Sequence, residues 1–175
     1  MRISTVTKNN IQRYRELILP YVYDEFKDAL DETGTEYLAI AAVLQPKDPG
    51  YERNKAVSVL VIQPEPTGDL TIISIYTLPE YRRRGYATSL IDAAIKAARA
   101  MFIWEEDETE DIVILKTIYR LPYDILKVYE AFLIKNHFTQ FILLEEDLTG
   151  EDGSLDVWSA ECHLKFYRNQ VTSDA

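Results

Sequence analysis

The stretch PEYRRRGYATSLIDAAI, Pro79–Ile95, joins a turn, a run of positive charge and the start of a helix. Three arginines at 82–84 stand in a chain whose formal net charge is −10, and Gly85 follows them directly. Beyond the glycine, apolar residues recur at spacings of three and four, which predicts an amphipathic helix beginning near Tyr86. The stretch is therefore either a solvated turn or an anion-binding loop that opens a helix.

An anion-binding role is favoured by the physics of helix ends. The N-terminus of a helix carries unpaired N–H groups and the positive end of the helix dipole. A glycine there lets the backbone approach a phosphate, so that successive amides converge on it. The chain contains neither the GxxxxGK[ST] nor the GxGxxG pattern, so a P-loop and a dinucleotide fingerprint are not predicted. The loop favours phosphate binding of another kind, with the arginines adding charge-assisted hydrogen bonds.

The apolar patterns outside this stretch predict a mixed α/β (α+β) fold. Strands are predicted at Arg2–Val6, Tyr37–Leu44, Ala56–Ile62, Leu70–Tyr76, Ile112–Ile118, Phe138–Leu144 and Trp158–Phe166. Helices are predicted from a cap at Asn9 or Asn10 to Leu19, from Pro20 to Leu30, from Tyr86 to Phe102, and from Asp124 to Lys135. The order strand–helix–strand requires a parallel pair with a right-handed crossover, whereas the meanders favour antiparallel pairing. We expect a single domain, residues 1–175, with a mixed, mostly antiparallel central sheet and helices on both faces.

Composition narrows the class of protein further. Cys162 is the only cysteine, so neither an intrachain disulfide nor a zinc-binding thiolate cluster is expected, and a reducing, cytoplasmic location is predicted. The N-terminal residues lack an apolar signal region, and no apolar run has the length of a membrane span. The isoelectric point of about 4.7 argues against nucleic acid as a partner. Such acidity is compatible with a cationic substrate, or with solubility alone.

The segment IYTLPEYRRRGYA, Ile75–Ala87, resembles the signature of the GNAT superfamily of acyl-CoA-dependent N-acetyltransferases. That signature is an apolar strand end, a proline-containing turn and the pattern [RQ]-x-x-G-x-[GA], filled here by Arg82, Gly85 and Ala87. The predicted order of strands and helices is similar to that of the family over nearly the whole chain. The close match covers only Asp69–Arg99.

The resemblance implies acetyl-CoA as co-substrate, a primary amine of a small molecule or peptide as acceptor, and no metal. The coenzyme A pyrophosphate would lie on the backbone amides of the loop, beside the three arginines. The pantetheine arm would pair with the backbone near the end of the 70–76 strand, where this strand splays from the 112–118 strand. A backbone N–H at the same place would polarise the acetyl carbonyl. The residues so implied are Tyr76, Thr77, Arg82, Arg83, Arg84, Gly85, Tyr86, Ala87 and Thr88. A homodimer is compatible with this reading.

The chain departs from the family at the general acid. Many members carry a tyrosine that protonates the departing thiolate, and the alignment of KNHF with the family's ending places Leu133 at that position. Tyr129 lies one helical turn earlier and is the candidate acid. The alternative for Tyr129 is a core aromatic, in a helix whose inner face is predicted to hold Ile125, Val128, Tyr129, Phe132 and Leu133. A catalytically inactive acyl-CoA-binding or regulatory module therefore remains the alternative function.

Other polar residues are also candidates for the site. Ser74 is a candidate for holding a water molecule, and Glu36 for the general base. The stretch Tyr21–Glu32 is either an acceptor-binding wall or a helix with a solvated acidic face. The two histidines, His137 and His163, have no metal-ligand spacing and are expected to be structural or exposed.

Overall fold

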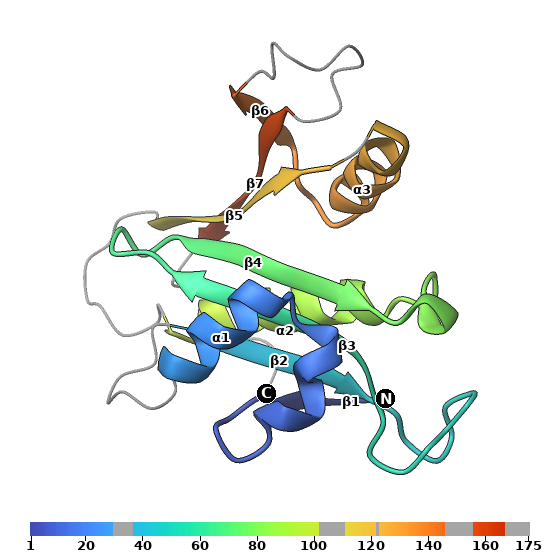
Figure 1. Cartoon of the computed structure of the whole chain (residues 1–175). Coiled ribbons are helices and arrows are strands. Elements are labelled where there is room, and N and C mark those ends of the chain that lie inside the picture. Colours follow the sequence, from blue (N-terminus) through green and yellow to red (C-terminus); the bar gives the residue numbers. More distant parts are fainter. Residues whose placement is uncertain (30–36, 102–110, 122, 146–155, 167–175) are drawn as a thin grey trace. The chain divides into compact units, whose positions relative to one another are not determined.

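The computed structural model describes residues 1–29, 37–101, 111–121, 123–145 and 156–166 (Figure 1). The elements are β1 (Arg2–Thr5), the 3₁₀ helix η1 (Ile11–Leu17), α1 (Pro20–Ala29), β2 (Leu38–Val43), β3 (Ala56–Pro64), β4 (Leu70–Thr77), the 3₁₀ turn η2 (Pro79–Tyr81), α2 (Tyr86–Met101), β5 (Asp111–Arg120), α3 (Tyr123–Lys135), β6 (Gln140–Glu145) and β7 (Val157–Phe166). All seven predicted strands are present.

The strands follow the order β1-β2-β3-β4-β5-β7-β6 in a mixed sheet. Neighbours at both ends of this order pair antiparallel, and β4, α2 and β5 form the predicted strand–helix–strand connection. The predicted fold class is confirmed. The chain divides into two compact units, Met1–Pro64 with Ile72–Ala94, and Glu65–Thr71 with Ile95–Ala175.

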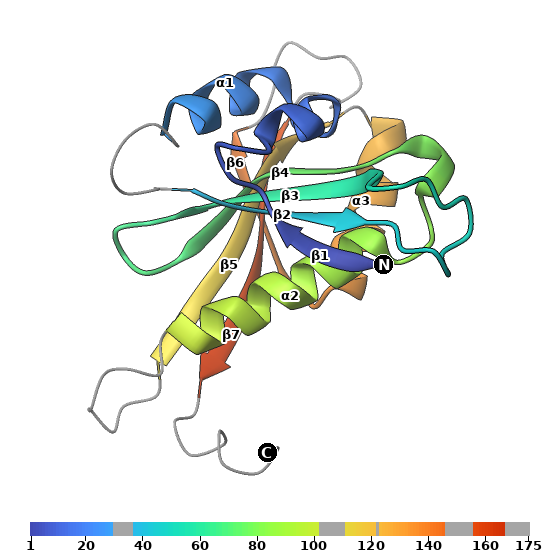
Figure 2. The ribbon, with the colours of Figure 1, turned by 90° about the horizontal axis from the view of Figure 1, so that it is seen from below.

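In the first unit, helices cover both faces of the strands. Figure 2 shows α1 on one face and α2 on the other. β3 is buried along most of its length because each face has a helical cover, and this explains its nearly continuous apolar sequence. One face packs residues from η1 and α1 against β2 and β3, with Tyr14, Leu17, Val22, Phe26, Ala41, Val59 and Val61 at its centre.

The first helix differs from the prediction, because residues 11–17 form a 3₁₀ helix instead of an α-helix. Its buried residues are Ile11, Tyr14 and Leu17, a spacing of three that matches the three residues per turn of a 3₁₀ helix. Asn10 does not cap it with its side chain. The Asn10 amide instead accepts a hydrogen bond from the Thr7 N–H at 2.8 Å and donates one to the Thr5 carbonyl oxygen at 3.1 Å.

In the second unit, β7 pairs antiparallel with both β5 and β6. Its predicted alternation holds from Ala160 to Leu164, where Ala160, Cys162 and Leu164 are buried, but not before it, because Ser159 is buried and Trp158 is only partly buried. Burial raises the pKa of the Cys162 thiol, so this cysteine keeps its proton and packs as a small apolar group. His163 is exposed and lies 3.1 Å from the Glu161 carboxylate, measured from Nε2 to Oε2.

The inner face of α3 was predicted only in part. Leu133 is buried, but Ile125 and Val128 are 48% and 65% exposed. Their predicted place in the core is wrong, because the face that packs on β5 is centred on Tyr129 rather than on the whole apolar set. Among the helices of the described ranges, none is long and apolar enough to cross a membrane.

The KNHF segment ends α3 through a Schellman arrangement. His137 has a left-handed backbone, φ +68°, and its N–H donates to the Ile134 carbonyl oxygen at 3.1 Å. The next N–H, of Phe138, donates to the Leu133 carbonyl oxygen at 3.1 Å. His137 is therefore an exposed helix-ending residue, as its predicted place in a turn suggests.

Candidate functional site

The end of β4 is fixed by a buried serine of β3. The Ser58 hydroxyl donates to the Tyr76 carbonyl oxygen at 2.8 Å and lies 2.8 Å from the Thr77 hydroxyl. One residue later, the Leu78 N–H donates to the Val57 carbonyl oxygen at 2.9 Å. These bonds hold residues 76–78, where the chain leaves the sheet, in one position.

Tyr81 anchors the turn that follows. Its ring is 5% exposed, and its hydroxyl donates to the Gly50 carbonyl oxygen at 3.1 Å. The cations of Lys55 and Arg84 lie over the ring, 5.3 and 5.1 Å from its centre. The edge-on ring of Tyr86 lies 6.3 Å away and connects Tyr81 to the first residue of α2. Sequence reasoning missed this anchor, because a single tyrosine in a turn carries no recognisable pattern.

The backbone from Arg83 to Gly85 is shaped for close approach. Arg83 and Gly85 both have left-handed backbones, with φ of +60° and +83°. A β-carbon built on Gly85 would meet no atom of the described residues within 4 Å, so the space over this glycine is open. The Ser89 N–H donates to the Gly85 carbonyl oxygen at 2.9 Å, which makes Gly85 the residue before the first turn of α2.

The backbone N–H groups of residues 83–88 are available to bind a ligand. Within the part of the chain that the structure describes, none of them donates a hydrogen bond. Six successive N–H groups without a partner among the described residues, at a helix start and with open space over Gly85, have the chemistry of an anion cradle. The predicted coenzyme A residues Arg82, Arg83, Arg84, Gly85, Tyr86, Ala87 and Thr88 lie between η2 and the first turn of α2, and Tyr76 and Thr77 lie at the end of β4. Their role in binding stays a prediction.

The three arginines of the loop have different environments, although all are exposed. The Arg82 Nε donates to the Thr77 carbonyl oxygen at 3.1 Å, and its guanidinium lies 5.6 Å from the centre of the Tyr76 ring. The Arg84 guanidinium is held over Tyr81. Among the described residues Arg83 makes no hydrogen bond or ion pair, so its charge is the one available to a ligand at the top of the loop.

Tyr129 lies on α3 against β5, in the second unit. Its hydroxyl is 3.4 Å from the Thr117 hydroxyl, and its ring contacts those of Tyr119 and Phe132 at centroid distances of 5.0 and 6.1 Å. Burial raises the pKa of Tyr129, so the phenol keeps its proton at neutral pH, as a general acid requires. Leu133, which the resemblance aligns with the family's tyrosine, is 1% exposed and belongs to the core.

The remaining candidates are not assembled into a site by the described residues. Ser74 is buried, and its hydroxyl has no hydrogen-bond partner among them. Glu36 lies outside the described residues. In the stretch Tyr21–Glu32, the Tyr23 and Phe26 side chains belong to the core, while Tyr21 is 64% exposed. No three metal-binding side chains gather into one group in the described ranges.

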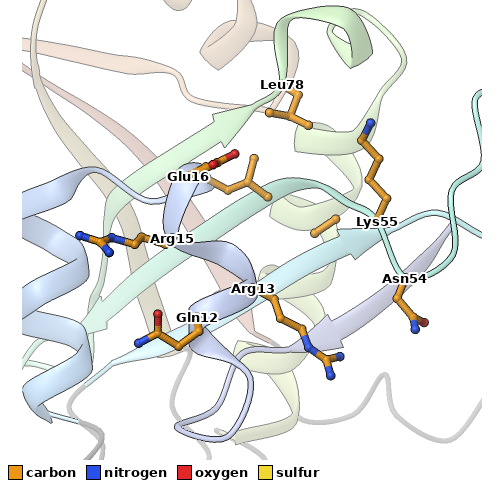
Figure 3. A pocket seen from close by; sticks show the side chains of 9 residues that line it. Gln12, Arg13, Arg15, Glu16, Asn54, Lys55 and Leu78 are labelled. Carbon is orange, nitrogen blue, oxygen red and sulfur yellow. The ribbon is translucent and has the colours of Figure 1, made fainter.

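A pocket of about 440 Å³ opens beside the end of β4 (Figure 3). It belongs wholly to the first unit, and η1, the residues before β3 and the residue after β4 line it. The lining residues are Gln12, Arg13, Arg15, Glu16, Leu17, Asn54, Lys55, Ala56 and Leu78. None of them was predicted as a site residue. The signal that could have found them is the spacing of three in η1, which leaves two polar rows beside one buried row.

Comparisons with known proteins identify a family and similar folds. The model of the acetyltransferase (GNAT) family matches residues 11–112, more than half of the chain, and no curated protein matches the sequence. The ribosomal-protein-S18-alanine N-acetyltransferase of Escherichia coli is similar in structure, with a TM-score of 0.60, 14% identity and 97% of both chains covered. An aminoglycoside 6′-N-acetyltransferase of Acinetobacter haemolyticus gives a TM-score of 0.56 and 20% identity, over 80% of this chain and 92% of that one.

A variant of the spermidine N-acetyltransferase of Vibrio cholerae gives a TM-score of 0.61 and 10% identity, over 93% of this chain and 92% of that one. At such identities the likeness to these structures shows the fold alone. The acceptors in their names are of three kinds: a ribosomal protein, an aminoglycoside antibiotic and the polyamine spermidine. The family model, the strand order and the loop before α2 lead to one conclusion: the chain belongs to the GNAT family of acetyltransferases.

Proposed function

We propose that this protein transfers an acetyl group from acetyl-CoA to the primary amine of a small molecule or peptide. The observation that carries the proposal is the cradle of amides at residues 83–88, with the open space over Gly85 and positive charge beside it. A pyrophosphate fits such a cradle because it offers several anionic oxygens to converging N–H groups. In a GNAT protein, coenzyme A is the ligand with that group.

In the proposed reaction, the main task of the protein is to position the amine and the thioester. Acetyl-CoA supplies an acetyl group activated as a thioester. The neutral amine bonds to the acetyl carbon as the C–S bond breaks, the amine loses one proton, and the leaving thiolate gains one. The ordered strand end at Tyr76 and Thr77 would hold the pantetheine arm and donate an N–H to the acetyl oxygen. A donor of this kind is worth about 3–4 kcal/mol of transition-state stabilisation in other acyl-transfer sites. Tyr129 is the proposed source of the thiolate's proton.

Binding of coenzyme A should raise the thermal stability of the protein. A ligand at 100 times its dissociation constant adds about 2.7 kcal/mol to the free energy of unfolding, which corresponds to about 5–10 °C in a chain of this size. We expect acetyl-CoA and free coenzyme A to produce this shift in a thermal-denaturation titration, and ATP to produce much less. The absence of a shift with both coenzyme A species at millimolar concentration would refute the assignment of the loop.

Removal of the free arginine should weaken binding without abolishing it. Arg83→Ala is expected to raise the dissociation constant of coenzyme A about three- to tenfold, because an exposed charge contributes modestly beside the backbone amides. Arg2→Ala, which makes the same change of charge in β1, is the control and should leave binding unchanged. Calorimetric titration measures both variants. Equal affinities in Arg83→Ala and the unmodified protein would show that Arg83 takes no part in binding coenzyme A.

A second candidate function is an acyl-CoA-binding or regulatory module without catalysis. The observation that favours it is Leu133, a buried core residue where many family members carry the tyrosine acid. Such a module would bind coenzyme A as proposed but would not acetylate any amine.

A further inference from the structure

We infer that the acceptor amine also carries a carboxylate, which Arg13 binds in the pocket beside the end of β4, where Arg15 and Lys55 add positive charge. The inference rests on the proposed function and specifies its substrate class. It predicts amino acids or short peptides as acceptors, and it disfavours polyamines and other amines that lack an acidic group.

The pocket owes its polar walls to the 3₁₀ geometry of η1. Side chains three residues apart lie in one row on a 3₁₀ helix, and the row Ile11, Tyr14 and Leu17 is buried. The two other rows pair Gln12 with Arg15 and Arg13 with Glu16, and all four side chains are exposed. η1 therefore sets two rows of hydrogen-bonding and charged groups around its buried row, and these groups line the pocket.

The floor of the pocket is apolar and continuous with the core. Leu17 is buried, and Ala56 and Leu78 pack against the same core cluster. A pocket with an apolar floor and a few polar groups at its edge is typical of a small-molecule site. Figure 3 shows Arg13 and Glu16 on η1 and Lys55 on the segment before β3, while Arg15 is directed toward α1.

The charge of the lining is positive although the protein is strongly acidic. The lining holds three cationic side chains, Arg13, Arg15 and Lys55, and one carboxylate, Glu16. Lys55 is paired with Glu52, Nζ to Oε1 at 2.6 Å, and the Arg15 guanidinium lies 5.8 Å from the centre of the Tyr23 ring.

Arg13 makes no ion pair or side-chain hydrogen bond to any described residue. An arginine available in this way matches a carboxylate, which it can bind with two parallel hydrogen bonds. Glu16, the single acidic group of the lining, is suited to an ammonium group.

The pocket is next to the place where the acetyl group would be delivered. Leu78 lines the pocket and is the residue directly after the end of β4 at Thr77. Lys55 also lines it and stacks on Tyr81, the anchor of the coenzyme A loop. A molecule held by its carboxylate in this pocket would therefore have its amine near the strand end that positions the thioester.

The positive charge of the lining matters more to a ligand in the pocket than the net negative charge of the whole chain, because exposed charges beyond about 8–10 Å are largely screened.

The test compares matched acceptors with and without a carboxylate, at concentrations expressed as the neutral amine because the carboxylate also lowers the pKa of the amine: L-phenylalanine with 2-phenylethylamine, L-lysine with cadaverine, and L-leucine with 3-methylbutylamine. We expect kcat/KM for acetyl transfer to be about tenfold or more higher for the amino acid in at least one pair. Arg13→Gln should remove most of that preference and Arg13→Lys should retain part of it. Arg2→Gln is the control of equal charge. In parallel, calorimetric titration of the same amino acids, with free coenzyme A present, measures binding without turnover.

The two proposals fail in different ways. Equal or better turnover of the amines without a carboxylate would overturn the carboxylate site and leave the acetyltransferase proposal intact. If no amine is acetylated, the titration decides: binding of an amino acid that Arg13→Gln abolishes supports the site. No binding of any of them, or binding that Arg13→Gln leaves unchanged, overturns it.

Discussion

Gly85→Val is expected to raise the dissociation constant of coenzyme A about a hundredfold or more. Gly85 has φ of +83°, where a β-branched side chain costs about 1–3 kcal/mol of strain. The valine side chain would also occupy the open space over Gly85, which is the space that the proposed pyrophosphate would need. Strain and obstruction act on the same few atoms, so binding should suffer far more than folding.

Gly68→Val separates the two causes. Gly68 has φ of +89° and lies in the turn between β3 and β4, so the backbone strain is matched at a position outside the loop. We expect both variants to lose similar thermal stability, and only Gly85→Val to lose affinity for coenzyme A in a calorimetric titration. Gly85→Ala should give an intermediate affinity. Normal binding by a folded Gly85→Val protein would mean that the loop is an ordinary turn.

Tyr129→Phe is expected to lower kcat about ten- to a hundredfold with little change in coenzyme A affinity. General acid catalysis spans about 10²–10⁴-fold, and a thiolate needs less help than most leaving groups. The phenylalanine ring keeps the contacts with Tyr119 and Phe132, and the hydrogen bond to Thr117 is long, 3.4 Å, so stability should change by about 1 kcal/mol or less. Single-turnover kinetics, where chemistry limits the rate, is the appropriate measurement.

Tyr119→Phe is the matched control, because it removes a hydroxyl from the neighbouring ring.

The pH dependence of kcat gives a second test of Tyr129. Burial raises the pKa of Tyr129 above its ordinary value of about 10, so the phenol is protonated below that pH. It becomes ionised only as the pH rises through the higher pKa of the folded protein. A fall in kcat that depends on Tyr129 should therefore begin only above about pH 10. An unchanged kcat in Tyr129→Phe would remove this residue from the mechanism and leave solvent as the proton source.

The fold could be predicted because strong local patterns agreed with it. Residues 56–62 read as a buried strand, and β3 is indeed covered on both faces by helices. The errors arose where the spacing of apolar residues fits more than one structure. A spacing of three in residues 11–17 is compatible with an α-helix until the buried row is seen, and apolar Ile125 and Val128 look like core residues although they are exposed.

The candidate site could be predicted where its chemistry is carried by the backbone. Gly85 and the start of α2 follow from the sequence, because only a few patterns place a glycine between cationic residues and a helix. The supporting contacts could not be predicted: Ser58 reaches β4 from another strand, and Tyr81 meets Gly50, which is 31 residues away in the chain. The pocket beside the end of β4 depends on three such distant segments and was missed entirely.

The most direct test of the proposed function is a turnover screen in which the protein is incubated with acetyl-CoA and a broad set of primary amines, and the products are identified by mass. The account predicts an amine product heavier by one acetyl group, one free thiol of coenzyme A released per product, and loss of both signals in Gly85→Val. Binding of coenzyme A without acetylation of any amine in the set would contradict it and would favour a binding module.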